Sequence, residues 1–123
     1  MPLGTAMTPD EFFAGNALLA RLFQAVRAAL ETIGDTTIRV TKSQIAFRRR
    51  RNFAWVWMPG QYLKRPAAPL VLTALPWRDG SPRWKEIVEP VAGRFTHHLE
   101  LHAVADIDDE VIEWLRKAWE AAA

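Results

Sequence analysis

The sequence has no cysteine, and this absence removes several kinds of site at once. A chain without thiols forms no disulfide, has no cysteine nucleophile and binds no zinc through cysteine. It also fits a reducing compartment, so the location we expect is the cytoplasm. No stretch approaches the ~20 apolar residues that span a bilayer, and residues 1–7 lack the basic start and apolar run of a signal peptide. We therefore expect no membrane partner.

The signatures of common enzymes are absent too. There is no Gly-x-Ser-x-Gly elbow, phosphate loop, dinucleotide fingerprint or His-Glu-x-x-His helix. The only serines are Ser43, in an expected turn, and Ser81, in an expected loop. Nucleophilic catalysis and a bound cofactor are therefore not expected, and a binding function is favoured over an enzymatic one.

Acidic residues are missing from one third of the sequence. Between Thr36 and Arg78 there is no aspartate or glutamate, although nine of the 16 lysines and arginines lie there, four of them consecutively from Arg48 to Arg51. The remaining seven basic residues are outnumbered by all 14 acidic ones. This segregation predicts a positive surface on one part of the fold, and such surfaces attract anions.

Composition and length indicate one soluble globular domain. Half of the residues are hydrophobic and 24% are charged, as in ordinary globular proteins. With 123 residues the chain has the usual length of a single domain. We expect residues 1–7 to form a loose N-terminus and residues 8–123 to form the domain.

Capping signals and apolar periodicity predict three helices. Thr8 to Glu11 begins a short helix that ends near Gly15, and a longer helix runs from Asn16 to a stop at Gly34. A third helix, with Asp106 as the expected cap, closes the chain.

Alternating polarity predicts about five strands. They span residues 37–41, 44–50, 53–58, 70–75 and 94–101. Residues 77–90 are expected to be a loop with one helical turn around 84–88, and Pro59 to Pro69 to be a rim loop whose Lys64 and Arg65 add positive charge. The expected fold is α+β, an antiparallel sheet packed against two N-terminal helices and one C-terminal helix.

Two-residue turns at 42–43 and 51–52 would place Arg48 opposite Trp55 and Arg50 opposite Phe53. One face of the sheet would then be apolar, and the other would combine guanidinium groups with large rings. The ligand-binding candidates on that second face are Arg39, Arg48, Arg50, Phe53, Trp55 and Trp57, joined by His98 if its strand belongs to the same sheet.

Arginines beside rings suit a ligand that has phosphates and bases, as in nucleotides and single-stranded nucleic acid. In the competing interpretation, the tryptophans are buried under a helix or the long loop, and the arginines pair with the acidic C-terminal helix.

The histidines are weak candidates for a metal site. Neighbours in a strand, such as His97 and His98, point to opposite faces. His98, Glu100 and His102 share a face but offer no fourth ligand, so we expect no metal. We interpret His97 as a hydrogen-bonded histidine at the core edge. His98 with Glu100 is the candidate pair for acid–base catalysis.

Several blocks in order carry a family resemblance. They are Phe47 to Leu63, Ser81 to Lys85, Phe95 to Leu101 and the closing Asp-rich helix. Together they resemble a bacterial family of small domains known as "domain of unknown function 5655". The resemblance implies a small α+β fold and brings no activity, cofactor or catalytic residue.

The leading hypothesis is a small non-enzymatic module that binds an anionic ligand, nucleic acid or a nucleotide, on its basic and aromatic sheet face. One alternative is a protein-interaction or homodimerisation domain in which the basic sheet meets an acidic helix of a second copy or partner. The other is a small acid–base enzyme that uses His98 and Glu100.

Overall fold

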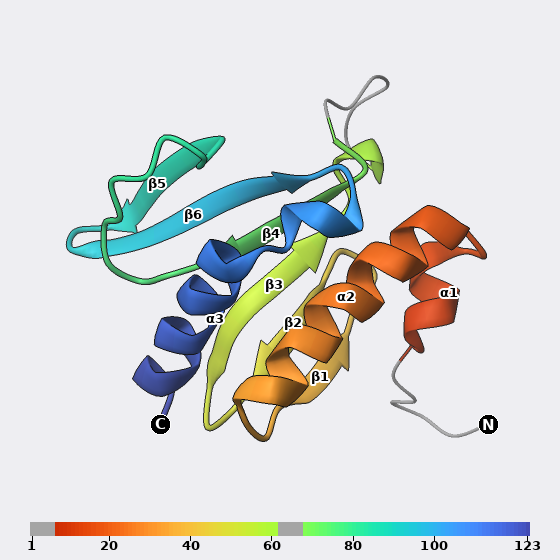
Figure 1. The fold of residues 1–123 in the computed structure, drawn as a ribbon, viewed down its shortest axis with the longest axis horizontal. Helices are drawn as coiled ribbons and strands as arrows, with labels where there is room; N and C mark the ends of the chain where they lie inside the picture. Colours follow the sequence, from red (N-terminus) through yellow and green to blue (C-terminus); the bar gives the residue numbers. More distant parts are fainter. Residues whose placement is uncertain (1–6, 62–67) are drawn as a thin grey trace.

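The computed structural model describes residues 7–61 and 68–123 and contains two layers. Three α-helices, α1 (Pro9–Phe13), α2 (Ala17–Ile33) and α3 (Asp109–Ala121), lie on one face of an antiparallel sheet (Figure 1). The expected α+β arrangement is confirmed, with six strands rather than five. Of the helices within the described ranges, none is both long and apolar enough to cross a membrane.

The sheet has the strand order β1-β2-β3-β4-β6-β5, and every neighbouring pair is antiparallel. The strands are β1 (Thr37–Val40), β2 (Ile45–Arg48), β3 (Asn52–Trp57), β4 (Leu70–Ala74), β5 (Glu86–Val91) and β6 (Arg94–Leu101). A short 3-10 turn, η1 (Pro59–Gln61), follows β3, and another, η2 (Val104–Asp106), precedes α3. The expected Lys64 and Arg65 loop charges and most of the expected N-terminal lead-in lie outside the described residues.

The helix starts follow from local side-chain chemistry. Thr8 caps α1, as the sequence predicts, and forms a capping box with Glu11. Asn16, at the expected start of α2, caps that helix by accepting the Leu19 N–H. The expected cap of α3 is wrong, because Asp108 accepts the Val111 N–H and serves as the N-cap. Asp106 ends η2 instead, where its carboxylate accepts the N–H groups of His102 and Ala103.

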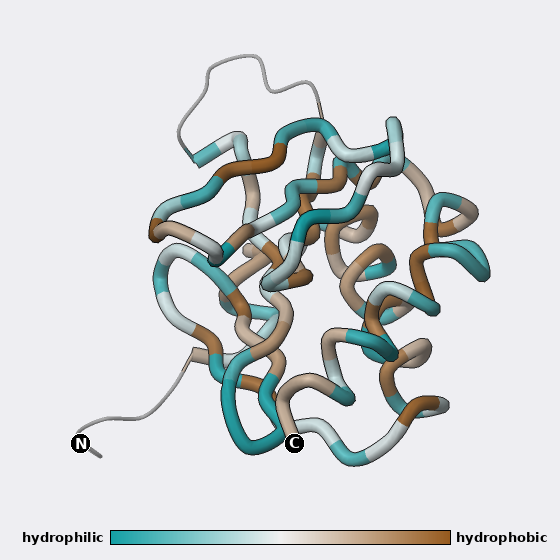
Figure 2. The backbone as a smooth tube through the Cα atoms, turned by 90° about the vertical axis from the view of Figure 1, so that its left-hand side faces the viewer, coloured by the Kyte–Doolittle hydropathy of each residue, from teal (hydrophilic) through white to brown (hydrophobic). Residues whose placement is uncertain are grey.

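The core lies between the helices and the sheet, and Figure 2 shows the two layers side by side. Phe23 of α2 and Phe47 of β2 stack at 5.9 Å between ring centroids, and both are fully buried. Other members of the core come from the apolar stripes of α2 and α3 and from alternate residues of the strands, among them Leu22, Val26, Leu30, Ile45, Val56, Leu72, Leu101, Val111 and Leu115.

β5 is the strand that the sequence prediction missed. The expected helical turn at residues 84–88 is wrong, since β5 pairs with β6 at the edge of the sheet. The edge position explains the miss. Glu86 and Glu89 are exposed there, and Pro90, which has no N–H to donate, is tolerated in an edge strand.

The expected pairing of β1 with β2 is confirmed, and that of β2 with β3 is wrong. Thr41 donates its N–H to Gln44 O at 2.9 Å, as a two-residue turn requires. Farther along, Trp55 lies opposite Ala46, and Arg48 lies opposite Asn52. Arg50 is therefore in the turn that joins these strands and does not pair with Phe53.

A register shift beside Arg48 also changes the face of Phe53. Because Phe47 pairs with Ala54 while Arg48 pairs with Asn52, Phe53 is an extra residue in β3. Its ring is only 5% exposed and belongs to the core, so its expected place on the outer face is wrong.

Candidate functional site

The candidate site is the sheet face that the three helices leave uncovered, which we call the open face. One row of paired residues crosses it from β1 to β6: Arg39, Ala46, Trp55, Thr73 and His98. The strand of His98 therefore shares a sheet and a face with the tryptophans, as the alternation predicts. Arg48 pairs with Thr37 and lies on the same face of β2 as Ala46.

The two tryptophans of β3 are partly exposed on this face. Trp57 donates its indole N–H to Thr73 Oγ1 at 3.0 Å, and its ring lies edge-on to His98 with centroids 5.8 Å apart. Trp57 is thus fixed by its neighbours. The described helices lie on the other face of the sheet, so burial of the tryptophans beneath a helix, one half of the competing interpretation, is not observed.

His98 is held by the same hydroxyl. Thr73 Oγ1 lies 2.8 Å from Nδ1 of His98. Thr73 Oγ1 accepts from Trp57 and either donates to Nδ1 or accepts from it, so the hydroxyl links the two rings with either tautomer of His98. Burial lowers the pKa of His98 below its ordinary value, the Glu86 carboxylate opposes this shift, and His97 adds to it.

This shift predicts a pH-dependent stability. As pH falls, the unfolded chain protonates His98 before the folded one does, so the stabilisation is full above about pH 6.5 and is lost below it. Urea unfolding at about pH 7.5 and 5 should therefore show a smaller pH effect in His98→Gln than in the wild type. His102→Gln, at an exposed histidine, is the control and should keep the wild-type dependence. Identical pH dependence in His98→Gln and the wild type would contradict the assignment.

Two arginines of the run from Arg48 to Arg51 bind the C-terminus of α3. Arg49 lies 3.5 Å over the Trp119 ring and donates to Trp119 O at 3.2 Å, and Arg51 donates to Ala121 O at 3.2 Å. Guanidinium groups at a helix C-terminus satisfy its last carbonyls and complement its dipole. The hydrophilic turn beside the C-terminus is visible in Figure 2. These two arginines therefore contact backbone carbonyls, where the competing interpretation expected carboxylates.

The other arginines of the predicted site remain available. Arg39, Arg48 and Arg50 are exposed, and none has a side-chain hydrogen bond or ion pair within residues 7–61 and 68–123. Arg39 and Arg48 lie on the open face, and Arg50 lies in the turn at its end.

The other residues considered for a metal or acid–base site are His97, Glu100 and His102. His97 is fully buried, accepts the Asp79 N–H at Nε2 (2.9 Å) and lies 3.2 Å from Leu75 O at Nδ1, which confirms a hydrogen-bonded histidine at the core edge. Glu100 is 4.0 Å from His102. In the part of the chain that the structure describes, no three His, Cys, Asp or Glu side chains are grouped to hold a metal ion.

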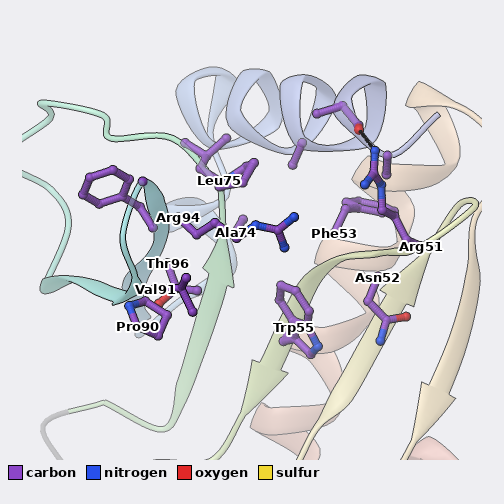
Figure 3. A pocket seen from close by; sticks show the side chains of 16 residues that line it. Arg51, Asn52, Phe53, Trp55, Ala74, Leu75, Pro90, Val91, Arg94 and Thr96 are labelled. Carbon is purple, nitrogen blue, oxygen red and sulfur yellow. Dashed lines mark hydrogen bonds between the residues drawn. The ribbon is translucent and has the colours of Figure 1, made fainter.

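A cavity of about 570 Å³ adjoins Trp55 where β4 ends (Figure 3). It brings in residues that the sequence did not indicate as site residues: Arg51, Asn52, Arg94, Phe95 and Thr96. Arg94 lies outside the acid-free segment and 39 positions beyond Trp55, so no local pattern links the two.

The chain matches a known protein family. The model of the family DUF5655, described as a domain of unknown function, matches residues 9–122. No curated protein and no solved structure matches the chain.

Proposed function

Since the chain belongs to the DUF5655 family, a domain of unknown function, we propose a function from its geometry: it binds single-stranded nucleic acid on the open face. The arginines hold phosphates, and the tryptophan rings stack on bases. The binding residues in this proposal are Arg39, Arg48, Arg50, Trp55 and Trp57, with His98 at the border. The module is non-enzymatic, and its lack of cysteine supports the cytoplasm as its location.

One observation carries the proposal: unpaired cations and partly exposed rings share a sheet face that no described helix covers (Figure 1). In the row from Arg39 to Trp55 the intervening residue is Ala46, whose short side chain is only 4% exposed between its two longer neighbours. Neighbouring strands lie about 4.8 Å apart, so a guanidinium and an indole two strands apart can contact one nucleotide.

The charge distribution across the sheet favours binding of an anion at the β1–β3 end. Glu86 and Glu100, which share the face of His98, lie on the β5–β6 side. β1, β2 and β3 contain no acidic residue. A polyanion is therefore favoured at β1–β3 over the part of the face around Glu86 and Glu100.

Salt dependence tests the phosphate contacts. Each contact to a single strand contributes about −0.7 to the slope of log K against log salt, so three arginines predict a slope of about −2. Affinity for a fluorescent single-stranded DNA or RNA 12-mer should then fall about 18-fold between 50 and 200 mM salt. In the variant Arg39→Ala/Arg48→Ala the slope should drop to about −0.7.

The matched control removes two positive charges from the helical layer. Arg21 of α2 and Lys117 of α3 are exposed, so Arg21→Ala/Lys117→Ala changes net charge equally and should leave the slope near that of the wild type. Absence of binding at low salt, or the same slope in both double variants, would reject the open face as the binding surface.

A further inference from the structure

We infer that the cavity at the end of β4 is a separate small-molecule site, which takes an aromatic carboxylate with its anionic group on Arg94. We call it the sheet notch and define it by Phe53, Trp55, Leu75, Arg94, Phe95 and Ala121, all of which line it. It does not rest on the proposed binding of nucleic acid, with which it shares only Trp55.

The sheet notch exists because β4 is shorter than its two neighbours. Ala74 is the last residue of β4, and it pairs with Ala54 of β3 and His97 of β6. β3 extends beyond this level to Asn52, and β6 extends to Arg94. Leu75 then has a left-handed φ of 65°, a rare conformation for a bulky residue. Pro76 O still accepts the Phe95 N–H of β6 at 2.9 Å, whereas the pairing with β3 has ended at Ala74. A space between two strands is thus left without the strand that separates them elsewhere.

Small residues of α3 keep this space from being filled. Ala118, Ala121 and Ala122 line it from the helical side, where longer side chains would occupy the volume. The resulting cavity of about 570 Å³ falls within the roughly 300–1,000 Å³ of typical small-molecule sites. Mostly apolar walls with a few polar groups are also typical of such sites.

The polar groups of the sheet notch select an anion. Arg94 reaches from β6 into the cavity between Ala74 and Phe53 (Figure 3). Its guanidinium has no hydrogen-bond or ion-pair partner in the described part of the chain. Arg51 adds a second positive charge while donating to Ala121 O. Among the described residues that line the cavity there is no aspartate or glutamate. Glu89 of the β5–β6 hairpin accepts the Gly93 N–H.

The side chains that line the sheet notch indicate what the uncharged part of the ligand is. Trp55, Phe53 and Phe95 provide ring surfaces, and among the described lining residues the uncharged polar groups come from Asn52, Thr96 and the indole N–H of Trp55. Such a lining gives few partners to sugar hydroxyls or base edges, which argues against a nucleotide. A planar carboxylate matches the guanidinium fork, and a flat apolar body matches the rings. The favoured class is therefore a small aromatic carboxylate.

Titration of the purified protein with 2-naphthoate tests this inference, with binding measured by isothermal titration calorimetry and by Trp fluorescence. The neutral isostere 2-naphthamide should bind about tenfold or more weakly, because it lacks the charge-assisted bonds. Arg94→Gln should weaken naphthoate binding to a similar degree and leave naphthamide unchanged. Acetate and inorganic phosphate, which lack the apolar body, should not compete at equal concentration.

Ala121→Leu is a second variant, which should block both aromatic probes by filling the cavity from an exposed helix position. Arg21→Gln on α2 should bind like the wild type. Equal affinity for naphthoate and naphthamide, or naphthoate binding unchanged in Arg94→Gln, would overturn the assignment. Arg39→Ala/Arg48→Ala should keep naphthoate binding. The binding of naphthoate and the binding of nucleic acid are therefore tested by different variants, and either proposal can fail without the other.

Discussion

Replacing His97 with leucine should lower the free energy of unfolding by about 2–5 kcal/mol, because a buried and a part-buried backbone group lose their partners. His97 is fully buried, with Nε2 accepting from the Asp79 N–H and Nδ1 donating to Leu75 O. Leucine fills similar space but can pair with neither group. Urea unfolding at neutral pH measures the loss, which is a large share of the ~5–15 kcal/mol typical of a domain.

The neighbouring histidine provides the control. His98 faces the opposite side of the same strand, is only partly buried and bonds to Thr73. His98→Leu should cost about 1 kcal/mol, since a single hydrogen bond is lost and Thr73 Oγ1 keeps its bond from the Trp57 indole N–H. His97→Gln should recover part of the stability, as its amide can accept from Asp79. Equal losses for the two leucine variants would contradict the role given to His97.

The sheet face on which a side chain lies was predictable from the sequence even where its partner on the neighbouring strand was not. The expected partner of Trp55 was Arg48 and the observed partner is Ala46, two residues away. Because side chains alternate with a period of two, a slip of two residues leaves both on the same face. Alternation likewise brought His98 to the face of the tryptophans, although the order of β4 and β6 in the sheet was unknown.

The turn between β2 and β3 could not be predicted because distant residues determine it. Arg49 and Arg51 bond to the carbonyls of Trp119 and Ala121, and the Arg50 N–H bonds to Ala122 O. A local pattern favours a two-residue turn, but the end of α3 holds three residues in it. The register shift that accompanies this turn takes Phe53 into the core.

The sheet notch could not be predicted from the sequence for a similar reason. It depends on where β4 stops, and β4 stops at a leucine in a left-handed conformation, which local rules assign to glycine or asparagine. Arg94 therefore enters the candidate site only once the lengths of three neighbouring strands are known. The basic run of the sequence is divided in the fold between capping α3 and the open face, and Arg94 supplies a positive charge that the run does not contain.

Replacing Gly34 with alanine should destabilise the protein by about 2–3 kcal/mol, the cost of forcing a methyl group against the Trp119 ring. A Cβ at Gly34 would lie 2.8 Å from Cη2 of Trp119 and closer still to Cζ2. The ring cannot easily retreat, because Arg49 covers it at 3.5 Å and its indole N–H donates to Asp35 O at 3.0 Å. The φ of Gly34 is 167°, which alanine adopts freely, so the effect is steric.

Two further variants isolate this contact. Gly80→Ala, where an added Cβ meets nothing within 4 Å, should change stability by less than about 0.5 kcal/mol. Trp119→Leu will itself destabilise by removing the contacts with Arg49 and Asp35, but in that background Gly34→Ala should cost little, since the obstructing ring is absent. A double-mutant cycle by urea unfolding therefore predicts a coupling of about 2 kcal/mol between the two positions. Additive losses would show instead that Gly34 matters through its backbone and not through the ring that packs on it.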